Sequence, residues 1–536
     1  MNSFIILALL KLWLVSGQTV YAIGWAGHDD RLYLNLASAF LKHGWLGHYS
    51  NLTLAKGPFY PFWIALTFVS GITLLLSQHL LYIAACVIFI IAVRPIVSRP
   101  IVLLLIWTIL LSNPMTYTSL ITRVVREGIY PALTIFVTSF SMGILVRHDR
   151  PLKSLNRWST GLGCSLSAFW LTREEGVWIM PLVLMVIGLA AVRMLQTRPI
   201  DWRRLSLVCA LPFCIWITVL GAVAGINKIG YGVFATVEFK SRDFLEAYGA
   251  LSRVMHANWQ RFVPVPEETR ERIYEVSPAF AELNPFLEGD IGKGWSYNSC
   301  RGASICNDIG GGWFMWAFRD AAAAAGHHKT GAAAASFYRR LATEVNAACA
   351  DGRLECRSKR ATLVPPWRDE YFRPLLSTMA RAAFYLARFE GFDAHSVPSE
   401  GSEESLLLFR DLTRDRLSPV TLAGRFPKQA KFDDFKIAIL GYIGKIYQIV
   451  MPVFIVAAFM VYMIRTALMI KKRTVTRIWM INGALLAAII IRLFIVSMIE
   501  VTSFPAICPL YLAPAYPQLL MFVILSFSSA SVPLLD

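Results

Sequence analysis

Two adjacent carboxylates, Asp29 and Asp30, follow within a few residues of an apolar run that begins the chain. Ionisable groups so close to a hydrocarbon layer are costly, and by default they mark a functional-site hypothesis. A carboxylate there can accept a proton from an attacking hydroxyl. The pair is therefore a candidate for a catalytic base, and its partners must be sought in other loops.

Other polar loops combine acids, cations and tyrosines. They supply Lys56; Arg123, Arg126 and Glu127 in "TRVVREGIYP"; Arg173, Glu174 and Glu175 in "LTREEGVW"; and Glu500, Tyr511 and Tyr516 in "IEVTSFPAICPLYLAPAYP". Lys and Arg can stabilise a phosphate as negative charge builds on it. Singly, each charge could be a helix cap or a snorkelling side chain. Together they predict a site with a base and an anion clamp.

The elements that must position these residues are membrane helices. The chain has 536 residues, 56% of them apolar, and a mean hydropathy of +0.52, against roughly 45–50% apolar residues in soluble domains. Apolar segments of about 17–25 residues can cross a hydrocarbon core of about 30 Å. We expect an all-α polytopic bundle of about 10–11 transmembrane helices. Candidate spans cover residues 4–23, 80–93, 101–112, 129–146, 158–171, 177–191, 205–224, 437–461, 479–499 and 519–529.

The basic loops predict an orientation. If residues 58–77 form a re-entrant or interfacial helix rather than an eleventh span, every strongly basic loop falls on one side, which the positive-inside rule makes cytoplasmic. The N-terminus then lies in the cytoplasm, residues 4–23 are a retained span, and six of the nine acids of the membrane part face the other side. We expect a bacterial inner (plasma) membrane protein.

A long polar insert separates the spans. We expect a membrane module at residues 1–225 with its first external loop at 24–57, a mostly helical periplasmic or extracellular domain at 226–435, and further spans at 436–536. The insert holds 27 basic and 26 acidic residues between Lys228 and Asp434, so +16 of the net charge of +17 resides in the membrane part. That distribution orients a membrane protein and argues against nucleic-acid binding.

Four of the nine cysteines lie in the insert as two close pairs, Cys300/Cys306 and Cys349/Cys356. Four cysteines allow three connectivities, of which the local pairs are the simplest. An oxidising exterior favours disulfides. Neither pair has the spacing usual in structural zinc sites. We therefore expect two structural disulfides.

Cofactor motifs are weak. His28, His43 and His48 share the first loop but fit no standard zinc spacing, so a divalent metal is not expected. The segment "GDIGKGW" lacks the Ser or Thr of a phosphate loop, and no strand–GxGxxG–helix unit occurs.

The first loop resembles a known family. "HDDRLYLNLASAFLKHG" and "LAKGPFYPFW" are similar to the first external loop of the GT-C superfamily of membrane glycosyltransferases, above all protein O-mannosyltransferases and the aminoarabinose transferases that modify lipid A. In those families an acidic pair, a Tyr three residues on and a Lys-Pro-Pro follow the first span. Here the Lys-Pro-Pro has become Lys56-Gly57-Pro58, and Arg173-Glu174-Glu175 replaces a family Lys.

The resemblance implies transfer of a sugar from a polyprenyl-phosphate donor, with inversion at the anomeric carbon. It makes Asp29 the general base or the carboxylate that orients the acceptor, and Asp30 a residue that supports it or shares its proton. Lys56 would hold the donor phosphate, and Tyr33 would shape the loop. From charge and topology we add Arg126 and Arg173 as phosphate partners, and Glu174 or Glu175 as acceptors for sugar hydroxyls. The acceptor, which could be a glycan, lipid or protein, is left open.

Two other classes fit parts of the pattern. One is an envelope glycan polymerase or ligase of another fold, whose usual signature is a large late external loop with essential arginines. The insert at residues 226–435 could resemble such a loop. A transporter favours discontinuous helices, charges near mid-membrane and paired halves. The charges here cluster at one face, which favours the transferase.

Overall fold

The computed structural model describes residues 2–173, 175–197, 199–418 and 427–530, and within these ranges the chain is helical without a β-sheet. Extended pairing there is limited to isolated bridges between Val20 and Leu417, Ile23 and Glu400, and Val254 and Cys356. The expected all-α class is confirmed.

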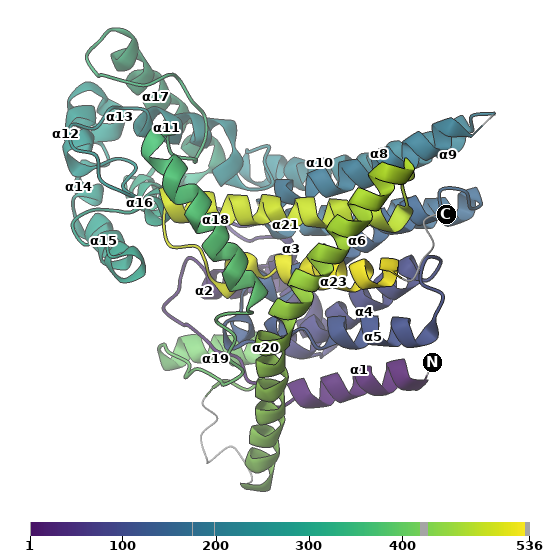
Figure 1. Ribbon diagram of the computed structural model, residues 1–536. Coiled ribbons are helices and arrows are strands. Elements are labelled where there is room, and N and C mark those ends of the chain that lie inside the picture. Colours follow the sequence, from purple (N-terminus) through teal and green to yellow (C-terminus); the bar gives the residue numbers. More distant parts are fainter. Residues whose placement is uncertain (1, 174, 198, 419–426, 531–536) are drawn as a thin grey trace.

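The apolar helices pack into one body, in which most run in roughly the same direction and α20 crosses obliquely (Figure 1). Their bounds are α1 (Asn2–Val15), α3 (Phe59–Ser70), α4 (Leu74–Val93), α5 (Pro100–Leu111), α6 (Tyr130–Val146), α7 (Leu152–Thr172), α8 (Met180–Gln196), α9 (Trp202–Cys209), α10 (Leu211–Tyr231), α20 (Pro427–Lys472), α21 (Arg477–Thr502) and α23 (Ala515–Ala530).

A helical lobe, residues 231–371, lies at one end of this body (upper left in Figure 1). Its helices are α11 (Arg242–Ser252), α12 (Glu267–Val276), α13 (Pro278–Ala281), α14 (Asn284–Leu287), α15 (Asp290–Ala303), α16 (Gly311–Ala324) and α17 (Gly331–Ala350). The connecting α-helices are α2 (Asp30–His43), α18 (Phe372–Ala387), α19 (Glu403–Thr413) and α22 (Pro509–Leu512). Short 3₁₀ turns are η1 (Pro114–Thr116), η2 (Ser119–Thr122), η3 (Arg126–Gly128), η4 (Gly176–Ile179), η5 (Glu238–Lys240), η6 (His327–Lys329) and η7 (Asp369–Tyr371).

Several of these helices can cross a membrane. Among the described residues, five are long and apolar enough: Leu74–Val93, Gly176–Gln196, Trp202–Tyr231, Lys428–Lys472 and Arg477–Thr502. The bent pair Pro100–Leu111 and Pro114–Thr122 would make a sixth, and four shorter apolar helices accompany them: Asn2–Val15, Phe59–Ser70, Tyr130–Val146 and Ala515–Ser528. With the bent pair and all four shorter helices the total among the described residues is ten, but one of the four is Phe59–Ser70, the expected re-entrant or interfacial helix. Nine of them correspond to expected spans, and the remaining expected span, 158–171, lies in α7.

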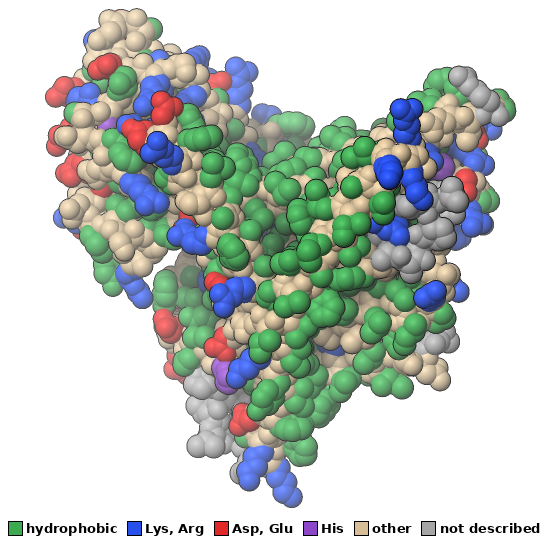
Figure 2. All heavy atoms as spheres, viewed as in Figure 1, with side chains coloured by type: hydrophobic (Ala, Val, Ile, Leu, Met, Phe, Trp, Pro, Cys, Tyr) green, Lys and Arg blue, Asp and Glu red, His purple; other side chains and the backbone are tan. Residues whose placement is uncertain are grey.

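The surface of the helical body agrees with a membrane environment. Hydrophobic side chains dominate it in Figure 2, whereas charged side chains gather on the helical lobe and near helix ends. Large exposed apolar residues include Ile217, Ile229, Ile449 and Val453. Soluble monomers rarely expose contiguous apolar surface of more than a few hundred Å². The chain is therefore an integral membrane protein.

The first apolar segment is shorter than predicted. A helix was expected through residue 23, but α1 ends at Val15. Beyond it the backbone pairs with a distant segment: the Val20 N–H donates to the Arg416 carbonyl at 2.8 Å, and the Gly24 N–H donates to the Glu400 carbonyl at 2.7 Å. These hydrogen bonds pair the backbone groups of residues 20–24, which would be paired within the helix if α1 continued.

The segment after the first loop is also short. Helix α3 has 12 residues and ends at Gly71, which adopts a left-handed conformation. At 1.5 Å per residue it spans about 18 Å, less than a hydrocarbon core of about 30 Å. This length agrees with a re-entrant or interfacial helix.

Two hydrophobic cores meet around the first loop. One fills the helical body, and it also includes Leu386 and Phe409 from α18 and α19. The other fills the helical lobe, and it takes in Leu32, Leu36 and Leu54 from the first loop. The first loop is therefore shared by the two cores, because its residues Tyr33, Leu34 and Ala37 belong to that of the helical body. The domain boundaries at 225/226 and 435/436 stay predictions.

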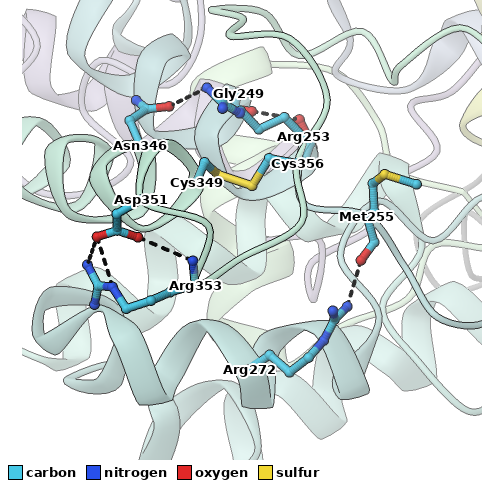
Figure 3. Close-up of a disulfide and its surroundings, with 10 residues drawn as sticks. Gly249, Arg253, Met255, Arg272, Asn346, Cys349, Asp351, Arg353 and Cys356 are labelled. Carbon is cyan, nitrogen blue, oxygen red and sulfur yellow. Dashed lines mark hydrogen bonds and ion pairs between the residues drawn. A yellow bond between two sulfur atoms is a disulfide. The ribbon is translucent and has the colours of Figure 1, made fainter.

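Both expected disulfides are present. Cys300 pairs with Cys306, and Cys349 pairs with Cys356. The second one joins the end of α17 to the segment that pairs with Val254 (Figure 3).

Candidate active site

The two aspartates lie where the first loop enters α2. Asp29 is the N-cap residue of this helix and Asp30 is in its first turn, where the helix dipole favours negative charge. The Asp29 side chain makes no capping hydrogen bond. Its Oδ1 instead accepts a hydrogen bond from Lys56 Nζ at 2.8 Å. This ion pair joins the beginning of the first loop to its end.

The neighbouring carboxylates have different surroundings. The Asp29 side chain is 56% exposed, whereas that of Asp30 is fully buried. Arg123 holds Asp30 through two hydrogen bonds, from Nε to Oδ1 at 3.0 Å and from Nη2 to Oδ2 at 2.5 Å. A substrate can reach Asp29, while Asp30 anchors α2 to the segment that contains Arg123.

Electrostatics also separates the two groups. Burial alone would raise the pKa of Asp29, but the Lys56 ammonium, together with Arg123 and Arg126, outweighs burial and lowers the pKa below its usual value. Burial raises the pKa of Asp30 to about 6, against the opposing effect of Arg123. Both carboxylates are therefore ionised at neutral pH.

Lys56 is held in a narrow aromatic environment. Its ammonium lies 5.2 Å from the ring centre of Trp316 and 5.8 Å from that of Tyr33, and its side chain is only 11% exposed. Tyr33 is buried and packs edge-on against Tyr60. Cation–π contacts of this kind favour one position for the cation.

The change from Lys-Pro-Pro to Lys-Gly-Pro has a structural reason. The Gly57 backbone lies so close to α7 that a Cβ there would be 2.1 Å from the Leu171 carbonyl oxygen. Any residue with a Cβ, proline included, would displace this contact. Gly57 therefore sets the approach of Lys56 to the end of α7.

A second cluster surrounds the buried Arg173, which follows α7. Its Nε and Nη2 donate to the two carboxylate oxygens of Glu175 at 2.7 and 2.9 Å, and its Nη1 donates to Glu127 Oε1 at 2.6 Å. These donors of Arg173 already have carboxylate acceptors, so the guanidinium serves to hold Glu127 and Glu175. Glu174 lies outside the described residues.

Arg126 connects the two clusters. Its Nη1 lies 3.5 Å from the Thr172 carbonyl oxygen and its Nε 3.9 Å from Glu127. The pKa of Asp29 is lowered mainly by Lys56, and that of Glu175 mainly by Arg173. Arg126 contributes to the lowering of both pKa values. Burial opposes both shifts. Of the predicted phosphate partners, Arg126 is thus the one whose charge acts on both clusters.

Arg492, which lies within the apolar helix α21, was not among the predicted site residues. It is buried, and its Nε and Nη2 donate to the Tyr511 carbonyl at 2.9 and 2.6 Å. Its guanidinium lies 5.5 Å from the ring centre of Trp178. A lone arginine in an apolar span is a signal that could have identified it.

The helical lobe also binds the first loop through side chains of α16. Asp320 of α16 accepts hydrogen bonds from His28 Nε2 at 2.9 Å and from Asn51 Nδ2 at 2.6 Å, and so binds both ends of the loop. The adjacent Arg319 donates from Nε to the Asn51 carbonyl at 3.0 Å. These contacts were not predicted, because about 270 residues separate the partners.

The arrangement combines a reachable carboxylate with cations held in place beside it. Within the described residues, no group of three or more His, Cys, Asp and Glu side chains could hold a metal ion. The available chemistry is proton acceptance by Asp29 and stabilisation of an anion by Lys56 and Arg126.

Comparisons with known proteins find a distant structural likeness. No family model and no curated protein matches the chain. Among solved structures, ArnT from Cupriavidus metallidurans in the apo state is similar at a TM-score of 0.31 and 14% identity, over 97% of this chain and 76% of that chain. The same protein bound to undecaprenyl phosphate is similar at a TM-score of 0.31 and 12% identity, over 97% and 77%. A likeness of this size leaves the chemistry of the chain to be argued from its own residues.

Proposed function

We propose that this chain is an integral membrane glycosyltransferase of the GT-C type, which transfers a sugar from a polyprenyl-phosphate donor to an acceptor on the extracytoplasmic side. The observation that carries the proposal is the ion pair between the exposed Asp29 and Lys56, at the end of an apolar helical body. The resemblance of the first loop to that superfamily supports the same reading.

In the proposed reaction, an acceptor hydroxyl attacks the anomeric carbon of the donor sugar, and Asp29 takes its proton. The bond from that carbon to the phosphate oxygen breaks, and attack from the opposite face inverts the configuration. Polyprenyl phosphate leaves with the bonding electrons, and Lys56 and Arg126 stabilise its charge.

The Asp29–Lys56 pair has two consequences for this reaction. Lys56 weakens Asp29 as a base in the free protein, because it lowers the pKa of the carboxyl. A donor phosphate that contacts the Lys56 ammonium would share this cation and relieve the effect. Donor binding would therefore strengthen the base when it is needed.

The two disulfides and the basic loops support an orientation with the N-terminus in the cytoplasm and the helical lobe in an oxidising compartment, which for a bacterial inner membrane is the periplasm. Asp30 would hold α2 through Arg123, and Tyr33 would shape the loop. Arg173 would position Glu127 and Glu175, with Glu175 as an acceptor for sugar hydroxyls.

The test uses a strain that lacks the chain, complemented with wild-type protein, Asp29→Asn or Asp30→Asn. Mass analysis of envelope glycans and lipids should show a sugar modification that the wild type restores and Asp29→Asn does not, at equal membrane protein levels. If both aspartate variants restore the modification fully, the proposed function is wrong.

A further inference from the structure

A cavity lies where the helical lobe meets the end of α21, and Asp29 is not among its lining residues. It is a cavity of about 210 Å³ between the segment after α11, residues 357–371, the start of α16 and the end of α21. Ligand pockets for drug-sized molecules measure about 300–1,000 Å³. This cavity is therefore large enough for one small ring rather than for an extended chain.

Its charges all have one sign. Arg357 and Arg368 line the cavity, and none of the described lining residues is Asp or Glu. Arg368 Nε is buried and has no hydrogen-bond partner among the described residues. The contact of Arg368 with an acid, Glu370 at 3.5 Å, involves Nη2, and the Glu370 side chain is 59% exposed. Because Nε is covered by protein, a ligand in the cavity must approach the Nη groups of Arg368, whose side chain is 25% exposed.

His256 adds a neutral polar group. Burial, and to a smaller extent the Arg368 charge, lowers its pKa, so the ring is neutral at pH 7. Its Nε2 lies 3.2 Å from the Pro264 carbonyl and donates to it in the matching tautomer. The other ring nitrogen, Nδ1, is then an acceptor, which suits a hydroxyl group.

Aromatic rings form another part of the cavity wall. The rings of Trp259 and Tyr371 lie 6.4 Å apart, and the Arg368 guanidinium lies 4.7 Å from the Trp259 ring centre. The negative face of an aromatic ring attracts the weakly positive C–H groups of a sugar face. A sugar ring with an anionic group therefore fits this cavity, because its C–H face can pack on the aromatic rings while its anionic group meets the arginines.

The disulfide keeps this wall in place. The backbone of Cys356 forms an antiparallel bridge with that of Val254. Two hydrogen bonds flank this bridge: the Met255 N–H donates to the Glu355 carbonyl at 2.8 Å, and the Arg357 N–H donates to the Arg253 carbonyl at 2.9 Å. Arg272 Nη2 also donates to the Met255 carbonyl at 2.6 Å (Figure 3). The bond from Cys356 to Cys349 fixes this pairing to α17, so Arg357 is positioned before any ligand arrives.

Helix α16 relates the cavity to the first loop. Gly311 at its start lines the cavity, Trp316 contacts Lys56, and Asp320 binds His28. At 1.5 Å per residue, Gly311 and Trp316 are about 8 Å apart along the helix. A ligand in the cavity would lie near the candidate active site and still be separate from it.

We propose that this cavity binds an anionic sugar unit, such as a uronic acid or a sugar phosphate, through Arg357 and Arg368. Arginine pairs with carboxylate and phosphate through two parallel hydrogen bonds, which a neutral sugar cannot form. Binding does not depend on the proposed function. The further role, in which the cavity holds part of the acceptor, rests on it.

The test measures binding to the full chain in nanodiscs of neutral phosphatidylcholine. Galacturonate, glucose 1-phosphate, glucose and inorganic phosphate are titrated without donor, with tryptophan fluorescence as the readout. At least one anionic sugar should bind at least tenfold more tightly than glucose or inorganic phosphate, and Arg368→Gln should weaken this binding at least tenfold. The control Arg242→Gln, an exposed residue paired with Glu246, should bind like the wild type.

If glucose binds as tightly as the anionic sugars, the ligand does not need a negative charge and the proposal is wrong. If inorganic phosphate binds as tightly as the anionic sugars, the ligand does not need a sugar ring and the proposal is wrong. Absence of any binding would overturn the site as a whole. If Arg368→Gln lowers the melting temperature, Arg357→Lys supplies a second variant that keeps the charge but loses the paired geometry. Asp29→Asn should bind the anionic sugar like the wild type, so unchanged transfer in this variant, together with retained sugar binding, refutes only the proposed function.

Discussion

Gly57→Ala is the substitution for which the structure makes the sharpest prediction. The new Cβ would lie 2.1 Å from the Leu171 carbonyl oxygen and 2.8 Å from its carbon. Restoring an ordinary contact requires a shift of roughly 1 Å. The opposing atoms are backbone atoms of the last turn of α7, so no side-chain rotation can relieve the clash.

Two measurable effects follow from that shift. Overpacking of this kind costs about 1–3 kcal/mol of unfolding free energy. Lys56 precedes Gly57 and must move with it, and a misplacement of about 1 Å in a site can cost about 10²-fold in rate. We therefore expect a lower melting temperature and sugar transfer reduced by about two orders of magnitude.

The assay pairs thermal unfolding, followed by intrinsic fluorescence in detergent, with the transfer assay on the same preparation. Gly27→Ala is the matched control, because a Cβ at Gly27 would meet nothing within 4 Å and this residue lies in the same loop. If Gly57→Ala and Gly27→Ala have the same melting temperature and the same rate, the close approach of the loop to α7 is refuted.

Three other predictions concern charges of the site. Asp29→Asn should reduce transfer at least 10²-fold and shift the unfolding free energy by only about 0–1 kcal/mol, because the Asp29 carboxylate is more than half exposed to water; a large fall in melting temperature would assign Asp29 to structure instead. Arg123→Gln should cost about 3 kcal/mol, because it leaves the buried Asp30 unpaired, and thermal unfolding beside the exposed Arg242→Gln measures the difference. The lowered pKa of Asp29 keeps the base ionised, and its ion pair intact, until the pH falls below the usual carboxyl range. Lys56→Gln should therefore move the acidic limb of the transfer rate to higher pH, and an unchanged limb would contradict the role of Lys56.

The sequence was sufficient for features that depend on local pattern. Apolar runs predicted the helical body, and close spacing predicted both disulfide pairs. The motif around Asp29 and Lys56 indicated that these residues act together, and the structure places them 2.8 Å apart. These features are readable because their partners are near in sequence or share one loop.

Tertiary pairing accounts for what could not be predicted. The hydrogen bonds between Arg123 and Asp30 join residues 93 positions apart. The hydrogen bonds of Asp320 to the first loop join residues about 270–290 positions apart. The end of α1 at Val15 depends on hydrogen bonds from residues 400–418, which no local pattern reveals. The hydrogen bonds of Arg173 to Glu127 and Glu175 are likewise visible only in the folded chain, and its expected role as a phosphate partner stays a prediction.

The bridges that tie residues 20–24 to residues 400–418 constrain the order of biosynthesis. The first loop emerges early, but its supports in α16 and near Glu400 follow about 300 and 380 residues later. At about 5–20 residues per second, the ribosome needs roughly 20–75 s more to supply them. The Asp29–Lys56 site would thus be completed only once residues 400–418 have been synthesised, and a fragment ending at residue 225 would insert its helices without a fully supported site.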